Sequence, residues 1–121
     1  MNNDRLRAEL CRVEDIEDPG SRGFAAKIGD RMVNILVVHR GNRVYAYRNH
    51  CPHTGSPLDW MPEQFLSIDR KYIQCATHDA LFRIDDGRCI SGPCHGDSLD
   101  AIPLEVRSGH IFLITAGGRL R

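Results

Sequence analysis

The sequence predicts an all-β protein built as an antiparallel β sandwich or small barrel. Two observations lead to this prediction: the strand-like segments are short and recur at even spacing, and turn residues such as glycine, aspartate and asparagine separate many of them. At 121 residues the chain is most simply one domain, long enough to bury roughly two-thirds of its unfolded surface. We find no internal repeat, low-complexity stretch or linker that would divide it.

The N-terminal half predicts four strands, over residues 6–13, 24–28, 32–39 and 44–47. Leu6, Ala8 and Leu10 alternate with polar residues, as the buried face of a strand does, and an acidic turn follows this first strand. Gly29-Asp30 separates the second strand from the third, and this pair is a hairpin signal.

The C-terminal half predicts five strands, over residues 73–75, 80–84, 89–90, 104–107 and 111–115. Asp85-Asp86-Gly87 turns the chain back after the second of these, and Ser108-Gly109 forms a hairpin between the last two. One short helix is indicated around residues 62–66, where Pro62 can occupy the first helical turn.

Composition excludes several classes of function. The 16 basic and 16 acidic residues balance, so no basic stripe points to nucleic acid. Apolar runs such as residues 35–38 are far shorter than the roughly 20 residues that span a bilayer. No apolar segment of signal-peptide length follows the polar N-terminus. We therefore expect a soluble, cytoplasmic protein that binds neither nucleic acid nor membrane.

Two cysteine–histidine pairs are the most informative feature of the chain: Cys51-Pro52-His53 and Cys75-Ala76-Thr77-His78. Each pair offers one thiolate and one imidazole from a short loop. Two sulfur and two nitrogen ligands suit a Rieske [2Fe–2S] cluster, in which histidines replace cysteines on one iron. A tetrahedral zinc site uses the same ligand types. The five cysteines form no C-x-x-C motif, which argues against a thioredoxin-like pair and a zinc ribbon.

The residues around the first pair favour a cluster. Pro52 biases Cys51 toward an extended conformation, so that ligands two residues apart point the same way. Residues 54–58 then offer small side chains and backbone amides, and such amides donate hydrogen bonds to the bridging sulfides of a cluster.

The two loops, taken with their neighbouring residues, resemble those of a known family. The segments C-P-H-T-G-S-P-L (51–58) and C-A-T-H-D-A-L-F-R-I-D-D-G-R-C-I-S-G-P (75–93) are similar to the two cluster-binding loops of Rieske-type ferredoxins. With the surrounding strands, the resemblance covers roughly residues 30–114. It implies a Rieske-like antiparallel β fold, with a small cluster-binding subdomain (about 48–94) inserted in a larger β base.

The resemblance also implies the cofactor and its ligands. Cys51 and Cys75 would hold the inner, buried iron of a [2Fe–2S] cluster, and His53 and His78 would hold the outer iron at the tip. The stretch between the loops is longer than is usual in the family, so residues 59–71 are expected to form an extra excursion.

Departures from the family pattern set the expected redox potential. High-potential members carry an extra cysteine in each loop, joined as a disulfide, and this chain has Ser56 and Thr77 there. Those members also carry hydroxyls that donate to the cluster sulfurs, where this chain has Ala80 and Phe82. Fewer hydrogen bonds stabilise the reduced cluster less, so we expect a potential nearer about −150 mV than +300 mV.

The other cysteines and histidines have plainer interpretations. Cys89 and Cys94 are interpreted as small buried hydrophobes, with a disulfide or a second thiol site as alternatives. Cys11 is expected to pack in its strand. Three further histidines near turns are expected at the surface: His39, His95 and His110.

We therefore expect a one-electron carrier, not itself an enzyme, that receives an electron from a reductase and delivers it to an oxygenase or another redox enzyme. No nucleotide-binding glycine motif or second iron site accompanies the two loops. The alternatives are a Rieske small subunit of a larger oxidoreductase, such as a nitrite-reductase-like or oxidase assembly, a redox-sensing module and a zinc-binding module.

Overall fold

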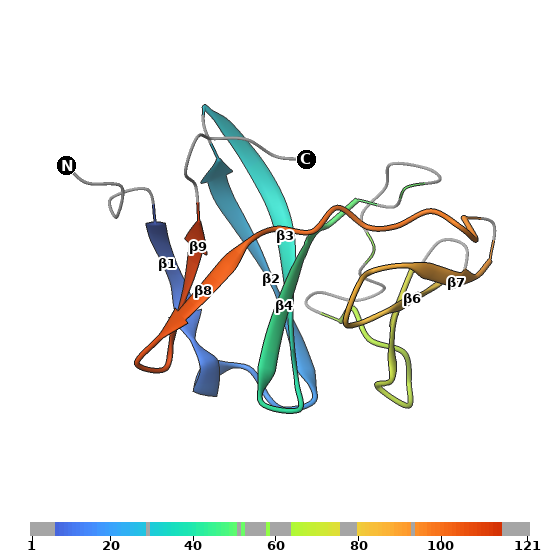
Figure 1. Cartoon of the computed structure of the whole chain (residues 1–121), viewed down its shortest axis with the longest axis horizontal. Helices are drawn as coiled ribbons and strands as arrows, with labels where there is room; N and C mark the ends of the chain where they lie inside the picture. The colour runs from blue at the N-terminus through green and yellow to red at the C-terminus, as the bar shows by residue number, and fades with distance from the viewer. Residues whose placement is uncertain are drawn as a thin grey trace.

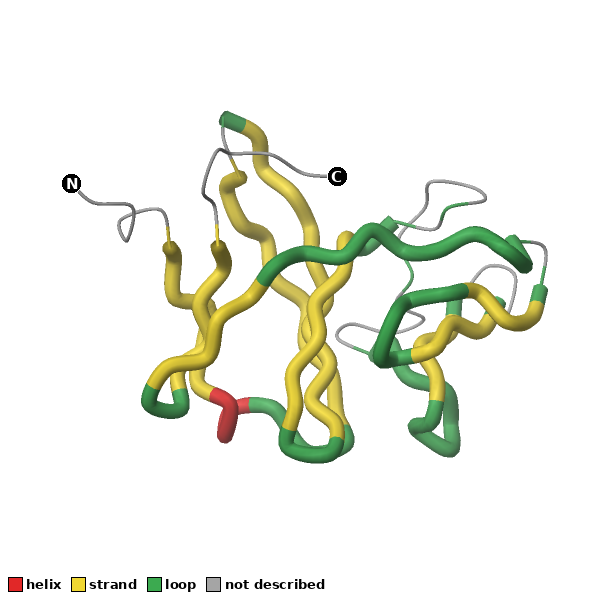
Figure 2. The backbone as a smooth tube through the Cα atoms, viewed as in Figure 1, coloured by secondary structure: helices red, strands yellow, loops and turns green. Residues whose placement is uncertain are grey.

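The computed structural model describes residues 7–28, 30–50, 52, 58, 64–75, 80–92 and 94–114, and it confirms the predicted all-β architecture. The strands are β1 (Arg7–Arg12), β2 (Gly20–Ile28), β3 (Arg31–Arg40), β4 (Arg43–Arg48), β5 (Tyr72–Gln74), β6 (Leu81–Arg83), β7 (Cys89–Ser91), β8 (Leu104–Arg107) and β9 (His110–Ile114). They form three antiparallel sheets in the orders β1-β9-β8, β2-β3-β4 and β5-β6-β7 (Figure 1). In the described part of the chain, the one helical element is a single 3-10 turn, η2 (Val13–Asp15), which follows β1 (Figure 2).

Two hairpins predicted from turn residues are confirmed. β2 and β3 pair antiparallel up to Ile28↔Arg31, and β8 and β9 pair up to Arg107↔His110. The β2 strand begins at Gly20, earlier than predicted, because its pairing with β3 extends to His39.

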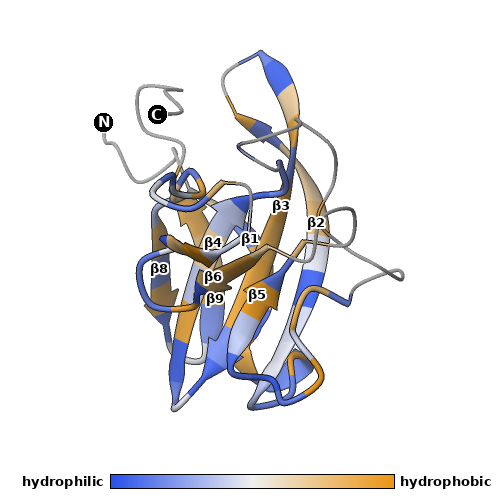
Figure 3. Ribbon diagram, turned by 90° about the vertical axis from the view of Figure 1, so that its right-hand side faces the viewer, coloured by the Kyte–Doolittle hydropathy of each residue, from blue (hydrophilic) through white to orange (hydrophobic). Residues whose placement is uncertain are grey.

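The central strand β3 is buried on both faces, because alternate residues of a strand point to opposite sides. Ile35 and Val37 pack into one cluster, which we call the base core, and Leu36 and Val38 pack into another, which we call the small-sheet core. All four side chains have 0% exposure. The hydrophobic stretch of β3 appears in orange in Figure 3.

The two cores define three layers. The base core joins the central sheet to β1-β9-β8 and consists of Ile16, Ile28, Val33, Ile35, Val37, Ala46, Ile102, Ile111 and Leu113. The small-sheet core joins the central sheet to β5-β6-β7 and consists of Leu36, Val38, Tyr47, Leu58, Phe65, Leu66, Ile73, Cys75, Ala80, Phe82, Ile84, Cys89, Cys94 and Leu99. The central sheet therefore supports the small sheet, which carries the second predicted ligand loop.

The chain returns from the small sheet to the base along β4. The N–H of Arg48 donates to the carbonyl of Asp100 at 2.8 Å, and the N–H of Ile102 donates to the carbonyl of Ala46 at 2.9 Å. Between these bonds, Tyr47 and Ala101 form an antiparallel bridge. This return segment fixes the small sheet against the central sheet.

The helix predicted around residues 62–66 is wrong over its described part. Leu66 forms an antiparallel bridge with Ile73, and the N–H of Gln74 donates to the carbonyl of Phe65 at 2.8 Å. Pairing with β5 and burial of two apolar side chains override the helix signal of the proline, which itself lies outside the described residues. No helix in the described ranges is long and apolar enough to cross a membrane.

The surface position predicted for His39 is also wrong. This side chain is buried, at 7% exposure, and its Nδ1 lies 2.8 Å from the carbonyl oxygen of Ile16. Its Nε2 lies 3.7 Å from a carboxylate oxygen of Asp18. The segment that joins η2 to β2 covers the end of β3, and this long-range contact leaves no local sequence signal.

Candidate metal centre

Cys75 is the one predicted ligand among the described residues, and it follows β5 directly. It is completely buried, at 0% exposure. Its backbone N–H donates to the carbonyl oxygen of Ala80 at 2.9 Å, across residues 76–79. This bond continues the β5–β6 ladder, whose last pair is Gln74↔Leu81. The second predicted ligand loop therefore begins and ends on a paired, buried hairpin.

The first predicted ligand loop is also closed at its base. The N–H of Leu58 donates to the side-chain oxygen of Asn49 at 2.7 Å, across residues 51–57. Asn49 in turn donates its own N–H to the carbonyl of Asn34 on β3 at 2.8 Å. The sequence did not predict that Asn49 closes this loop. An amide side chain immediately before a ligand loop is the signal that could have found it.

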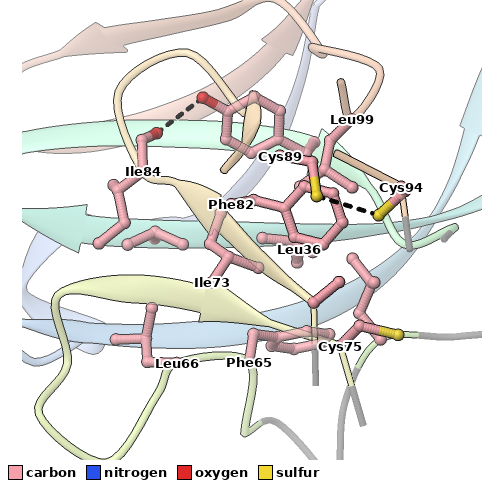
Figure 4. Packing of buried hydrophobic residues seen from close by; sticks show 14 residues of the cluster. Leu36, Phe65, Leu66, Ile73, Cys75, Phe82, Ile84, Cys89, Cys94 and Leu99 are labelled. Carbon is pink, nitrogen blue, oxygen red and sulfur yellow. Dashed lines mark hydrogen bonds between the residues drawn. The ribbon is translucent and has the colours of Figure 1, made fainter. Parts of the chain in front are cut away.

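The bases of the two loops meet in the small-sheet core. Leu58, Cys75 and Ala80 all belong to this core, and each has 0% exposure. Figure 4 shows Cys75 at the edge of the core, with its sulfur directed away from Ile73. The other three predicted ligands, Cys51, His53 and His78, lie outside the described residues.

Gly92 packs against Ala80, at the end of the second predicted ligand loop. Its φ of +103° is a conformation that residues with a side chain rarely adopt. A Cβ at this position would lie 2.8 Å from the Cα of Ala80, closer than real contacts allow. The glycine of the S-G-P run is therefore required both by its backbone conformation and by close packing.

The Asp-Asp-Gly-Arg turn fixes the other end of β6. Asp86 forms an ion pair with Arg83 and accepts the N–H of Arg88 at 3.0 Å. The hydrogen bond from Arg83, followed by that from Arg88, holds the pKa of the Asp86 carboxyl below its usual range. Gly87 has a φ of +75°, and a Cβ there would lie 2.7 Å from the ring of Tyr47. This glycine lets the turn approach β4 closely.

Comparison with protein families identifies the class. Residues 7–108 match the family model of the Rieske [2Fe-2S] domain, and the chain belongs to this family. Rieske domains bind a [2Fe–2S] cluster, so the predicted fold and cofactor are confirmed.

Solved structures with a similar fold include two ferredoxin-sized chains. One comes from a complex of reduced oxygenase and oxidised ferredoxin in carbazole 1,9a-dioxygenase, with a TM-score of 0.73, 22% identity, and coverage of 95% of this chain and 96% of that one. The other is the ferredoxin of carbazole 1,9a-dioxygenase from Nocardioides aromaticivorans IC177, with a TM-score of 0.69, 20% identity, and coverage of 89% and 96%.

A third similar chain is much longer than this protein. It comes from a carbazole-bound complex of oxygenase and ferredoxin of carbazole 1,9a-dioxygenase, with a TM-score of 0.70 and 18% identity. The match covers 90% of this chain and 28% of that one. The comparison with curated proteins found no match.

The described residues fit the cofactor of the family. A buried cysteine thiolate is the ligand type that holds the inner iron of a Rieske cluster, and Cys75 is fully buried in an apolar core. Both ligand loops start and end at hydrogen-bonded positions, which gives the rigid frame that a cluster needs. Within the described ranges, which include Cys75 but not the other three predicted ligands, no group of three or more histidine, cysteine, aspartate or glutamate side chains is placed to hold a metal ion.

Proposed function

We propose that this chain is a one-electron carrier in which a Rieske [2Fe–2S] cluster is held by Cys51, His53, Cys75 and His78. The two cysteines are proposed to bind the inner iron and the two histidines the outer iron. One observation carries the proposal: the family match spans both loops, and their described ends meet in one buried core that contains Cys75.

The bound cluster supplies reversible one-electron transfer, and the chain supplies ligation, shielding from water and a docking surface. Leu58, Cys75 and Ala80 are fully buried and exclude water from the inner side of the loops. The hydrogen bonds across the loop bases limit movement of the ligands when the charge of the cluster changes.

The proposed electron donor is a reductase, and the proposed acceptor is an oxygenase or another redox enzyme. The similarity to chains from ferredoxin–oxygenase systems supports this choice. We further propose that the carrier acts in the cytoplasm, has no catalytic site of its own, and folds as a single domain over residues 1–121 with a cluster-binding subdomain at about 48–94.

Anaerobic purification followed by iron and sulfide analysis tests the cofactor and its ligands. We expect two irons and two labile sulfides per chain and an electron paramagnetic resonance signal after reduction. Cys75→Ser and His78→Ala are expected to lose the visible spectrum and electron transfer, whereas His95→Ala, at an exposed histidine, retains both. Colourless protein that contains zinc and no labile sulfide would contradict the proposal.

A second candidate function is a fixed subunit of a larger oxidoreductase. It is favoured by the observation that the same fold covers 28% of a longer chain in the carbazole dioxygenase complexes. Purification from the native cell distinguishes the two functions. Recovery with another protein at constant stoichiometry indicates a subunit, and second-order electron transfer by the isolated chain indicates a carrier.

A further inference from the structure

Two cysteines outside the predicted ligand set face each other inside the small-sheet core. The sulfur atoms of Cys89 and Cys94 are 3.1 Å apart, and each residue has 1% exposure. Figure 4 shows the two side chains pointing toward one another beside Leu99 and Phe82. The pair is separate from Ser56 and Thr77, the positions at which the resemblance places the disulfide of high-potential members.

We propose that Cys89 and Cys94 form a redox-active dithiol that low-molecular-weight disulfides oxidise to an intramolecular disulfide. This modification site goes beyond the proposed electron-transfer function, and of its tests only the chelator assay rests on the proposed cluster. A disulfide has an S–S length of about 2.0 Å, so its formation requires the two sulfurs to approach by only about 1 Å from the observed separation.

The backbone holds the two cysteines in position before any oxidation. The N–H of Gly96 donates to the carbonyl of Cys89 at 3.4 Å, and the N–H of Cys89 donates to the carbonyl of Asp97 at 2.8 Å. The N–H of Asp97 donates to the carbonyl of Cys94 at 2.9 Å, and Gly92, with its φ of +103°, turns the chain between the cysteines. The loop is therefore closed already, and the disulfide replaces a contact that exists.

Simple packing explains the pair less well. A buried cysteine commonly serves as a small hydrophobe, and this role does not require two sulfurs to meet. Here the sulfurs lie in hydrogen-bonding contact, and the Cys89 sulfur also lies 3.2 Å from the carbonyl oxygen of Ser91. A metal site is also a poorer fit, because no third histidine, cysteine or acidic ligand joins them within the described residues.

Reagents reach the pair by local opening of one exposed turn. His95, Gly96 and Asp97 are all exposed, and they follow Cys94 directly. The hydrogen bonds that hold this turn include the three from Gly96, Cys89 and Asp97 and a bond of 3.1 Å from the N–H of His95 to the carbonyl of Gly92. Opening them leaves the β5–β6 ladder intact.

The reaction is a balanced thiol–disulfide exchange. The thiolate of Cys94 attacks one sulfur of the small disulfide, whose S–S bond breaks and releases one small thiol. The thiolate of Cys89 then attacks the Cys94 sulfur of the mixed disulfide, which forms the Cys89–Cys94 bond and releases a second small thiol. The two protein thiols lose two electrons and two protons, and the small disulfide gains them.

The new bond would flank Gly92, which packs against the end of the second predicted ligand loop. Gly92 is between the two cysteines in sequence and packs on Ala80, which accepts the N–H of Cys75. Oxidation therefore stiffens the segment that supports the second ligand loop. We expect it to slow loss of the cluster to an iron chelator.

Holo protein is equilibrated anaerobically with reduced and oxidised glutathione at a series of ratios, then alkylated and analysed by mass spectrometry. We expect the peptide that contains both cysteines to lose two hydrogens and escape alkylation as the oxidised fraction rises. Cys89→Ala and Cys94→Ala each abolish this species, and Cys11→Ala, in the base, leaves it unchanged.

Two results would overturn the proposal in the wild-type protein, where folding of a variant is not at issue. One is that both thiols stay alkylatable at every ratio, including oxidised glutathione alone. The other is that only mixed or intermolecular disulfides appear. The chelator assay supports the assignment if oxidised wild type releases iron several-fold more slowly than reduced wild type, and argues against it if the two rates agree.

Discussion

The hydroxyl of Tyr47 donates a hydrogen bond of 2.7 Å to the carbonyl oxygen of Ile84, which joins β4 of the central sheet to the turn after β6. Both residues are buried, at 3% exposure each. Burial raises the pKa of the Tyr47 phenol well above its usual range, with smaller contributions from Asp86 and Asp85, so the hydroxyl stays protonated and able to donate.

Tyr47→Phe is expected to lower the free energy of unfolding by about 1–3 kcal/mol, because it leaves the buried carbonyl of Ile84 without this donor. Urea unfolding of the holo protein measures the change. Tyr45→Phe is the matched control, since Tyr45 is only partly buried and its hydroxyl forms no hydrogen bond with another described residue. Equal losses in the two variants would contradict a specific role for the Tyr47 hydroxyl.

The hydrogen bonds of Asp18 are expected to make the stability of the protein depend on pH in the acidic range. Its carboxylate accepts the N–H groups of Asn42 at 3.0 Å and Gly41 at 2.9 Å, and these bonds lower the pKa of the carboxyl. In the unfolded chain this carboxyl titrates near pH 4. A lowered folded pKa stabilises the protein above that pH, and the contribution is lost as pH falls through the folded value.

Asp18→Asn is therefore expected to be less stable than wild type near pH 7 and to approach wild type as the pH falls toward about 3. Urea midpoints measured at several pH values give the comparison. The control is Asp30→Asn, because Asp30 is exposed and its carboxylate accepts no hydrogen bond from another described residue. A gap between Asp18→Asn and wild type that stays constant with pH would contradict the assignment.

The sequence predicted most of the fold because the relevant signals are local. The β3 strand contains the apolar run at residues 35–38, and its hairpin signal at residues 29–30 needs no distant contact to be recognised. Two features could not be predicted in the same way. The burial of His39 depends on a segment distant in sequence, and the bridge between Leu66 and Ile73 depends on tertiary pairing.

The candidate site shows the same division. The candidate ligands and the glycine-containing loops are visible in the sequence, since cluster chemistry demands particular residues at fixed spacing. The amide of Asn49 that closes the first loop and the contact of Gly92 with Ala80 are tertiary features. They are found only when the two loops are placed against the central sheet.

Gly92 and Gly96 form a matched pair for testing the contact between Gly92 and Ala80 at the end of the second predicted ligand loop. Both have a positive φ, +103° and +98°, so an alanine at either site introduces backbone strain of about 1–3 kcal/mol. Only at Gly92 does the added Cβ also collide with a backbone atom, the Cα of Ala80, while nothing lies within 4 Å at Gly96.

Gly92→Ala is expected to lower stability by at least about 1 kcal/mol more than Gly96→Ala, because overpacking adds to the strain. It is also expected to lose its cluster several-fold faster, since Ala80 accepts the N–H of Cys75. Urea unfolding and the decay of visible absorbance measure the two effects. If Gly96→Ala matches Gly92→Ala in both, the contact with Ala80 is not important.

Phe82→Tyr tests the low redox potential expected from the resemblance. Phe82 is completely buried on β6, two residues after Ala80, in the core that also contains Cys75. A hydroxyl that donates to a cluster sulfur stabilises the reduced state more than the oxidised state, because the reduced cluster is more negative. We expect the midpoint potential to rise by roughly 40 mV, which corresponds to about 1 kcal/mol of differential stabilisation for one electron.

Protein-film voltammetry measures this shift. We expect Ala80→Ser to raise the midpoint potential as well. Phe112→Tyr is the control, because it adds the same hydroxyl to β9, in the sheet on the other side of the central sheet, and is expected to leave the potential unchanged. A buried hydroxyl without an acceptor lowers stability without changing the potential. Destabilised Phe82→Tyr and Ala80→Ser variants at the wild-type potential would therefore show that these positions do not face the cluster sulfurs.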